Sequence, residues 1–499
     1  MLAWRESLVV LLATLAVRLA IAAFTPLFPD ETYYWDWSRR LDAGYFDHPA
    51  AIAWLIHAGT RLAGHTPFGV RAVPVLAGVL ATFFACAAAR HMAGGRAALI
   101  TAATFAVMPL SAAGLILATP DAPLLAAATL SVYGVVRAVD SPNRSLWSLG
   151  WWTLAGIGLG VMLLSKLTSV LLPFGIFVAL LGVRELRARL AEPGPYVATL
   201  VAVGVAYPFL IWNAQHDWIS FTFQLQHGLG SAKGSVIARE LDLIGGQIGL
   251  VSPVLFILLV IAIRHALRET EVPLRRLLAI TSLLVFAFFA YSATRRRVEA
   301  NWPALAYVPA VLLFTTRPRP WRSERWLQGG LGIAALATFI TYANAFVPVL
   351  PVPATRDPAA RAAGWEALAP AVRRTLAQRS RAHRTFLAGD RYQEASELAF
   401  QLRNHPTTYS LNLEGRANQY DLWPTFPQRA QPGDALVLVV DEMADAHPVA
   451  TLLTPHFAST ERGDVVTLER GGEAVKVLRI WVLDGWRGTW PRASLRSRP

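Results

Sequence analysis

The sequence has too few charged residues for an ordinary soluble protein. Asp, Glu, Lys and Arg make up 16% of its 499 residues, and hydrophobic residues make up 54%, whereas a soluble domain carries about a quarter charged residues. The shortage is local. Long apolar stretches with short Arg-bearing connectors fill residues 8–346, and residues 356–499 have a soluble composition. We therefore predict a polytopic α-helical membrane protein, with a transmembrane domain over residues 1–347 and a C-terminal domain over residues 348–499.

Cysteine and lysine are almost absent. The single cysteine, Cys86, lies in an apolar run and excludes a disulfide framework. Only three of the 46 basic residues are lysines, and the formal charge is +13. Most arginines stand in short loops beside apolar stretches, where they set topology and meet anionic lipid headgroups, so we expect no nucleic-acid partner. The chain also lacks a P-loop, a dinucleotide-binding glycine pattern and a nucleophile elbow, so we expect no use of cytoplasmic nucleotides.

Eleven apolar segments are candidates for membrane-spanning helices, which need about 20 mostly apolar residues. They are 7–28, 68–91, 97–115, 120–138, 149–165, 167–184, 195–212, 245–264, 274–292, 302–316 and 327–347. If the N-terminus is cytoplasmic, every connector on that side is basic, as the positive-inside rule expects. These connectors contain Arg90 and Arg96; Arg137 and Arg144; Arg184, Arg187 and Arg189; Arg264, Arg268, Arg275 and Arg276; and Arg317, Arg319, Arg322 and Arg325. The odd number of spans then places the C-terminal domain outside.

Two regions outside the spans have recognisable patterns. The first outer connector contains two amphipathic stretches, 31–41 and 50–62, which fit helices lying in the membrane interface. The C-terminal region alternates short strand-like segments with one helical segment, which predicts a small α/β domain. The strands are expected at 384–388, 435–440, 465–468 and 474–482, and the helix at 393–401.

Acidic residues stand at the outer ends of two spans. Asp30 and Glu31 follow the first span directly, and such a pair suits a general base or an anchor for a hydroxyl-bearing substrate. Alternatively, the pair caps the following helix, where carboxylates favour the helix dipole. Asp121 opens another span on the same side, and it too can serve chemistry or first-turn capping.

Basic residues on the outer side predict an anion. Lys166 interrupts an apolar run; it can hold a phosphate or carboxylate, or merely extend to the interface from a tight turn. Arg295, Arg296 and Arg297 break the positive-inside pattern, unless the spans are miscounted, and guanidinium groups bind phosphate well. Glu299 and Asn301 follow and can line the same cleft. Acids beside bases at this depth describe a site for a lipid phosphate.

Weaker signals suggest sugar binding. Asp47, His48 and Asn213 lie among aromatic residues, as in sugar-binding clefts, although aromatic anchoring at the interface explains the aromatics equally well. His48, His216 and Asp217 lack compact metal-ligand spacing. A divalent metal is thus possible but not required, and no metal ligands are assigned.

Several of these motifs resemble the bacterial branch of the dolichyl-phosphate-mannose-protein mannosyltransferase family, which includes the lipid A aminoarabinose transferases. They are Pro29-Asp30-Glu31-Thr32-Tyr33-Tyr34, Gly44-Tyr45-Phe46-Asp47-His48-Pro49, Thr119-Pro120-Asp121-Ala122-Pro123, Ser165-Lys166 and Asn301-Trp302-Pro303. Two C-terminal segments, Arg391–Phe400 and Asn418–Asp421, look like the C-terminal domain of relatives. The chain reads Asp47-His48-Pro49 where the aminoarabinose enzymes typically carry Glu-Lys-Pro.

The resemblance implies a GT-C membrane fold in the bacterial inner membrane and a polyprenyl-phosphate-linked sugar donor used on the periplasmic face. Asp30 would be the catalytic base with Glu31 beside it, and Lys166 with Arg295, Arg296 and Arg297 would hold the donor phosphate. Substrate contacts would come from Tyr33, Tyr34, Asp47, His48, Asp121, Asn213, Glu299 and Asn301. We expect inverting sugar transfer to a lipid, glycan or protein.

A flippase of polyprenyl-linked sugars is the alternative, but it should carry charges near the middle of the bilayer and related halves. A binding or sensor protein would have featureless spans.

Overall fold

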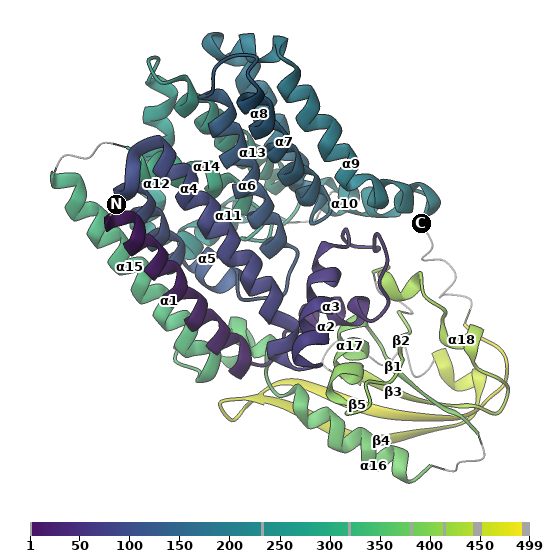
Figure 1. The fold of residues 1–499 in the computed structure, drawn as a ribbon. Helices are drawn as coiled ribbons and strands as arrows, with labels where there is room; N and C mark the ends of the chain where they lie inside the picture. The colour runs from purple at the N-terminus through teal and green to yellow at the C-terminus, as the bar shows by residue number, and fades with distance from the viewer. Residues whose placement is uncertain are drawn as a thin grey trace. The chain divides into compact units, whose positions relative to one another are not determined.

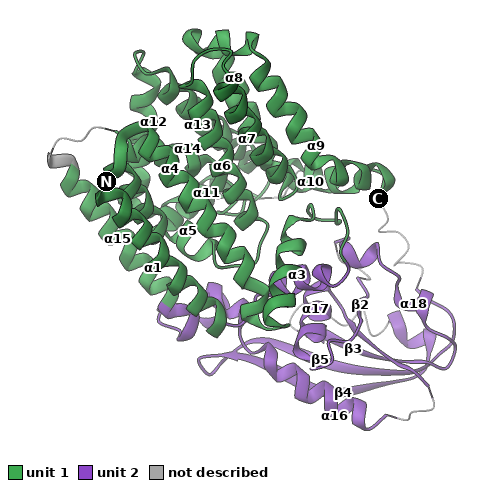
Figure 2. Ribbon diagram, viewed as in Figure 1, with its two compact units in different colours: residues 1–24, 41–342 green, residues 25–40, 343–499 purple. Residues whose placement is uncertain are grey.

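The computed structural model describes residues 2–230, 234–317, 321–379, 383–412, 416–442 and 452–491. Figure 1 shows the order of its helices and strands. Contacts divide the chain into two compact units, coloured separately in Figure 2: residues 1–24 with 41–342, and residues 25–40 with 343–499. Lys233 and Arg319 of the expected outer and inner connectors lie outside the described residues.

The first unit is built from helices. They are α1 (Leu2–Phe24), α3 (Ala51–Ala63), α4 (Pro67–Val107), α5 (Pro109–Gly114), α6 (Asp121–Val139), α7 (Leu146–Leu163), α8 (Leu171–Gly182), α9 (Pro193–Gln215), α10 (Ile219–Leu229), α11 (Val236–Val251), α12 (Pro253–Arg268), α13 (Pro273–Arg295), α14 (Ala304–Thr315) and most of α15 (Trp321–Phe346). Two 3₁₀ helices, η1 (Leu167–Val170) and η2 (Arg184–Ala191), flank α8. The expected helical membrane region is confirmed.

Three breaks interrupt the longer helices. Ala93 and Gly94 leave the helical conformation and divide α4, at the gap expected between 68–91 and 97–115. One straight helix over 245–264 is wrong: α11 and α12 meet at an angle of 103°. Ser252 between them has a φ of 82°, and Pro253 cannot continue the hydrogen-bonding of α11 because it has no N–H. The segment 167–184 likewise becomes η1 and α8, followed by η2 at 111°.

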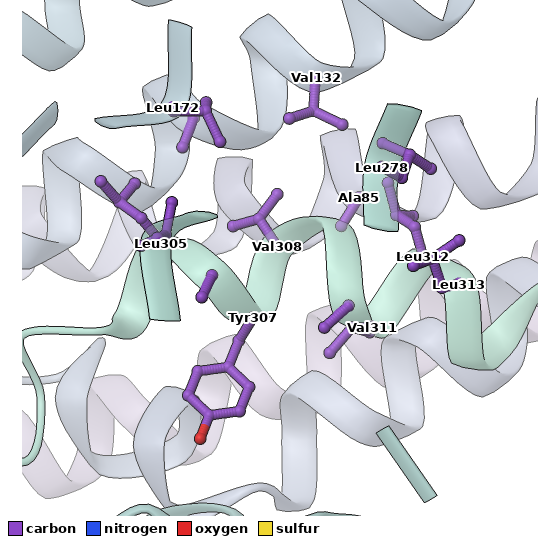
Figure 3. Close-up of a cluster of buried hydrophobic side chains, with 14 of the residues drawn as sticks. Ala85, Val132, Leu172, Leu278, Leu305, Tyr307, Val308, Val311, Leu312 and Leu313 are labelled. Carbon is purple, nitrogen blue, oxygen red and sulfur yellow. The ribbon is translucent and has the colours of Figure 1, made fainter. Parts of the chain in front are cut away.

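Helix α14 forms the centre of this unit. All of its residues from Ala304 to Thr315 are buried, as expected of a helix that is apolar on every side. In Figure 3 its side chains point outward to those of the surrounding helices, including Val132 of α6 and Leu278 of α13. At 12 residues it is only about 18 Å long, shorter than the hydrocarbon core of a bilayer.

Seven helices of the described residues are long and apolar enough to cross a membrane, or up to nine if each bent pair forms one span. Helix α1 also carries a buried arginine: the guanidinium group of Arg18 donates to the carbonyl oxygens of Phe105 and Ser111, at 3.0 and 2.9 Å. A charge in an apolar region must be satisfied in this way. The expected number of eleven spans stays a prediction.

The second unit combines α2 (Pro29–Ser38) with the C-terminal region. The latter contains α16 (Leu368–Ala377), α17 (Tyr392–Gln401), α18 (Phe426–Arg429) and the strands β1 (Thr385–Gly389), β2 (Thr408–Ser410), β3 (Ala435–Asp441), β4 (Phe457–Arg470) and β5 (Glu473–Trp486). The strand order is β2-β1-β3-β5-β4. The first three strands are parallel, and β5 and β4 are antiparallel. The predicted small α/β domain is confirmed, with α16, α18 and β2 as additions.

Strand β3 separates two apolar cores. Val437 and Val439 face one core with α16 and α17, and Leu436, Leu438 and Val440 face the other, because successive strand side chains point to opposite faces. Burial on both faces explains why this strand is apolar from Ala435 to Val440. Helix α2 packs on α17. A segment from the first outer connector thus belongs to the second unit.

Candidate active site

A buried cation is held by an acid and an amide in the first unit. The Lys166 ammonium group donates to Oδ1 of Asp121 at 2.8 Å, and the side-chain amide of Asn301 donates to Oδ2 of Asp121 at 2.6 Å. Lys166 and Asp121 are only 7% and 9% exposed. Lys166 therefore does not extend to the interface, and the Asp121 carboxylate binds two side chains. Three sequence-predicted site residues, separated by up to 180 positions, meet here.

Local breaks in the helices position this group. Lys166 stands in the extended conformation between α7 and η1, so its side chain leaves the helical path. Asp121 is the first residue of α6. The backbone N–H of Ala51, at the start of α3, donates to the carbonyl oxygen of Leu164 at 2.9 Å. This bond ties the first outer connector to the turn that carries Lys166.

The three consecutive arginines are dispersed. Arg295 ends α13 and is exposed. Arg296 donates to the carbonyl oxygen of Gln226 at 2.8 Å, and Arg297 lies 3.9 Å from Glu299 with both side chains mostly exposed. Among the described residues, no ion pair joins these arginines to Asp121. The chain continues from these arginines to Asn301, and the side chain of Asn301 does bind Asp121.

Three further candidate site residues of the first unit form hydrogen bonds that stabilise its connecting segments. Asp47 is buried, and its carbonyl oxygen accepts from the side-chain amide of Gln224 at 2.6 Å. The carbonyl oxygen of His48 accepts from the backbone of Tyr45 at 3.1 Å. Asn213 is fully buried; its amide group bonds the carbonyl oxygen of Phe209 and the backbone N–H of Ser220, both at 3.2 Å. These contacts show Asn213 joining the end of α9 to the start of α10.

The two adjacent carboxylates of the second unit differ sharply. Glu31 is fully buried, and its Oε2 accepts from the backbone N–H of Phe28 at 3.0 Å. It thus caps α2, which was the alternative expected for the pair. Asp30 keeps 38% of its side chain exposed. Of the two, Asp30 can meet a ligand.

Residues of the C-terminal region hold Asp30. The Tyr392 hydroxyl donates to Oδ1 of Asp30 at 3.0 Å, and the Arg361 guanidinium donates to Oδ2 at 3.4 Å. Tyr392 begins α17, so the packing of α17 on α2 places its hydroxyl. Sequence reasoning missed both partners, although Tyr392 belongs to a motif that it had noted.

Aromatic rings surround this part of α2. The ring of Tyr33 lies 4.4 Å from that of Tyr392, and its hydroxyl accepts from the backbone N–H of Gln419 at 2.6 Å. Tyr34 packs edge-on against Trp37 at 4.9 Å. Both tyrosines are buried. They fix the helix that carries Asp30.

Buried carboxylates lie beneath the same helix. Glu397 on α17 accepts from the Thr32 hydroxyl at 3.2 Å and from the Gln401 amide at 3.0 Å. Burial, above all, raises the pKa of Glu397 to about 8. Glu394, one turn before, pairs with Lys476 at 2.5 Å, and Lys476 also reaches Asp441 at 3.2 Å. No group of three or more His, Cys, Asp or Glu side chains suited to a metal gathers among the residues that the structure describes.

These arrangements suit different chemistry. A buried ammonium group paired with Asp121 can stabilise negative charge on a ligand. A partly exposed carboxylate with a neutral hydrogen-bond donor can accept a proton.

Residues 47–212 match the family model described as dolichyl-phosphate-mannose-protein mannosyltransferase. The chain is 30% identical over 317 residues to the lipid A galacturonosyltransferase RgtD of Rhizobium johnstonii, covering 62% of this chain and 64% of that protein. It is 29% identical over 216 residues to the undecaprenyl phosphate-alpha-4-amino-4-deoxy-L-arabinose arabinosyl transferase of Pseudomonas aeruginosa, covering 40% and 39%. The alignments thus span less than two thirds of these relatives.

The fold matches a solved structure over almost the whole chain. ArnT from Cupriavidus metallidurans, bound to undecaprenyl phosphate, superimposes with a TM-score of 0.69 and 16% identity. The match covers 95% of this chain and 97% of ArnT. Similarity at this level of identity concerns the fold.

Proposed function

We propose that this chain is a bacterial GT-C glycosyltransferase like the proteins it resembles, and that it transfers a sugar from a polyprenyl-phosphate-linked donor to an acceptor on the periplasmic face. Two observations, one in each unit, support this function: the acid Asp30 of the second unit is partly exposed, and Lys166 of the first unit is buried and charge-paired. The first supplies a base and the second supplies a cation for a phosphate.

Asp30 acts on the acceptor in this mechanism. The acceptor hydroxyl gives its proton to the Asp30 carboxylate as its oxygen attacks the anomeric carbon of the donor sugar. Attack from the side opposite the phosphate inverts that carbon. The hydroxyl group of Tyr392 orients the carboxylate through the 3.0 Å hydrogen bond, and Glu31 supports the reaction by fixing the start of α2.

Lys166 acts on the leaving group. The bond between the anomeric carbon and the phosphate oxygen breaks, and its electron pair leaves with polyprenyl phosphate. One N–H of Lys166 is directed at Asp121, and an ammonium group has two more to offer the phosphate. Electrostatic stabilisation of the departing charge lowers the barrier. The exposed Arg295 and Arg297 add positive charge that attracts the donor headgroup.

Proteins with similar sequences act on lipid A, lipopolysaccharide core and an undecaprenyl-phosphate aminoarabinose donor, as their names state. We therefore assign this chain an undecaprenyl-phosphate-type donor and a lipid, glycan or protein acceptor of the envelope. Tyr33, Tyr34, Asp47, His48, Asn213, Glu299 and Asn301 remain the proposed surroundings of the substrates. Sugar transfer needs no metal in this proposal, because protein cations supply the positive charge.

The proposed topology follows the basic connectors. The protein is a multi-pass protein of the bacterial inner membrane. We place its N-terminus in the cytoplasm, residues 1–347 in the membrane and residues 348–499 in the periplasm. Alkaline phosphatase, which is active only in the periplasm, can be fused to residue 499 or to residue 1 to test this orientation. The fusion at residue 499 should be active and the fusion at residue 1 inactive. A C-terminal fusion without phosphatase activity would contradict it.

Asp30→Asn tests the base. The variant should lower product formation by about 10²- to 10⁴-fold, the contribution of a positioned general base, and keep binding of undecaprenyl phosphate. Mass spectrometry of envelope glycolipids and glycoproteins from a deletion strain carrying each variant measures the product. Asp464→Asn is the matched control, because Asp464 is also exposed and also pairs with an arginine, Arg374, at 3.0 Å. Equal product from both variants would remove Asp30 as the base.

A further inference from the structure

A pocket of the second unit shares none of its lining residues with the proposed transfer machinery. It has a volume of about 450 Å³, in the usual range for small-molecule sites. Its walls come from Arg40, two residues beyond the end of α2, from the edge strand β2 and from the segment that leads into α18. The lining consists of Arg40, Thr407, Thr408, Tyr409, Ser410, Tyr420, Trp423, Pro424, Thr425 and Arg429.

The pocket is positively charged. Two arginines and no carboxylate belong to its lining. The Arg40 guanidinium stacks over the ring of Trp423, 4.0 Å from its centre, which fixes the plane of its N–H groups. Arg429 is exposed, and none of the described carboxylates forms an ion pair with it. Its charge is therefore available to a ligand.

The charges act on the interior of the pocket. Burial raises the pKa of Tyr409, and the positive charges of Arg429, Arg40 and Arg384 oppose that rise. Arg384 is neutralised by Asp434 at 2.8 Å, whereas no ion pair with a carboxylate is found for the exposed Arg429 among the described residues. A ligand with an anionic group matches this field.

The rest of the lining suits a carbohydrate. The hydroxyl groups of Thr407 and Ser410 lie beside or along β2, and the buried Oγ of Ser410 has no hydrogen-bond partner among the described residues. The hydroxyl group of Thr408 already donates to the carbonyl oxygen of Ala395 at 2.8 Å. Tyr420 is held in place because its hydroxyl donates to Asp36 at 2.8 Å. Its ring packs edge-on against Trp423 at 5.2 Å. Rigid aromatic rings beside several hydroxyl groups accommodate both the apolar face and the hydroxyl groups of a sugar.

We propose that this pocket binds an acidic sugar, a hexose that carries a phosphate or a carboxylate. Helix α2 links the pocket to the proposed base: Asp30 lies in its first turn and Arg40 lies just beyond its end, about 15 Å away along the axis. A sugar held in the pocket can thus anchor an acceptor glycan. That last step rests on the proposed function, whereas binding of the acidic sugar does not.

Isothermal titration of the full-length protein in lipid nanodiscs tests the proposal. Glucose 6-phosphate and glucuronate should bind at least about tenfold more tightly than glucose, since a charge-assisted hydrogen bond contributes about that factor. Arg429→Gln should weaken both acidic sugars by about tenfold. The matched control, Arg374→Gln, removes another exposed arginine of the same unit and should change nothing. An Arg40→Gln variant, checked by its thermal unfolding, gives a second test.

Other outcomes overturn the proposal or name the source of the sugar. Equal affinities of Arg429→Gln and Arg374→Gln, or no binding of either acidic sugar, would refute the pocket as the site. If inorganic phosphate bound as tightly as glucose 6-phosphate, recognition of the sugar part of the ligand would be refuted. A sugar phosphate carried on a lipid in the nanodisc, compared with the free one, shows which source is preferred, and either preference supports the proposal. Loss of transfer in Asp30→Asn with unchanged sugar binding separates this test from that of the proposed function.

Discussion

The proposed functional carboxylates of the two units differ in burial and in their hydrogen-bond partners. Asp121 of the helical unit is buried, and each of its oxygens has a side-chain partner, Lys166 or Asn301. Asp30 of the second unit is partly exposed and is held by a neutral hydroxyl at 3.0 Å and a more distant arginine. The carboxylate that pairs with a buried cation has a partner on each oxygen. A group that must exchange a proton is left accessible.

The largest effect is expected from breaking the fully paired group. Lys166→Met should destabilise the protein by about 3–5 kcal/mol, because it leaves the Asp121 carboxylate buried without its cation. Product formation should fall by about 10²- to 10³-fold through the lost stabilisation of the phosphate. Thermal unfolding in detergent and mass spectrometry of envelope products measure the two effects.

A double variant separates them. Lys166→Met combined with Asp121→Leu removes both charges, so stability should recover while transfer stays low. Recovery of transfer would show that the pair is only structural.

The second prediction concerns pH. The ordinary pKa of Glu397 is 4.5, and burial raises it to about 8 in the folded protein. The folded state thus binds more protons than the unfolded state between these values, and the stability of the second unit falls as pH rises from about 5 to 8, by on the order of a few kcal/mol. Glu397→Gln should flatten this dependence. Unfolding midpoints at pH 5, 6, 7 and 8 measure it, with Glu366→Gln, on a neighbouring 3₁₀ turn, as the control. Equal slopes in the two variants would contradict the assignment.

Tyr392→Phe tests the weaker hold on Asp30. Loss of the hydroxyl should lower transfer about tenfold, since a hydrogen bond to a charged group contributes about 1.5–3 kcal/mol, and stability should barely change. Tyr196→Phe, which removes an exposed hydroxyl group that donates to the carbonyl oxygen of Leu190 at 2.9 Å, is the control and should leave transfer unchanged. Similar losses in the two variants would argue against Tyr392 as the residue that positions Asp30.

The smallest effect is expected at the exposed arginines. Arg297 and Glu299 are 74% and 60% exposed at 3.9 Å, so Arg297→Gln should change stability by less than about 0.5 kcal/mol. It should weaken binding of undecaprenyl phosphate a few-fold, and high salt should remove the difference from the wild type. Arg264→Gln, on a connector assigned to the cytoplasm, is the control. A salt-independent loss would contradict an electrostatic role.

Sequence patterns predicted the helices and strands better than they predicted which residues contact one another. The apolar segments, the strand of residues 435–440 and the α/β character of the C-terminal region follow from periodicity and composition, which act locally. The bend at Ser252 was missed because nothing in an apolar run marks the residue before a proline as one with a positive φ. Asp121, Lys166 and Asn301 were each found as costly charges or amides beside apolar spans, but their bonds depend on tertiary packing. The contacts of Asp30 with Tyr392 and Arg361 span more than 300 positions, and no pattern in a single sequence contains them.

The membership of α2 in the second unit has a practical consequence for anyone who dissects or recombines this protein. A fragment beginning at residue 343 would lose the helix that covers α17, and it would expose Ser396 and Glu397, which contact Thr32. Chimeras that exchange the C-terminal region between relatives must therefore carry residues 25–40 along with it. Evolution faces the same constraint, because substitutions in these two distant stretches have to be compatible with each other.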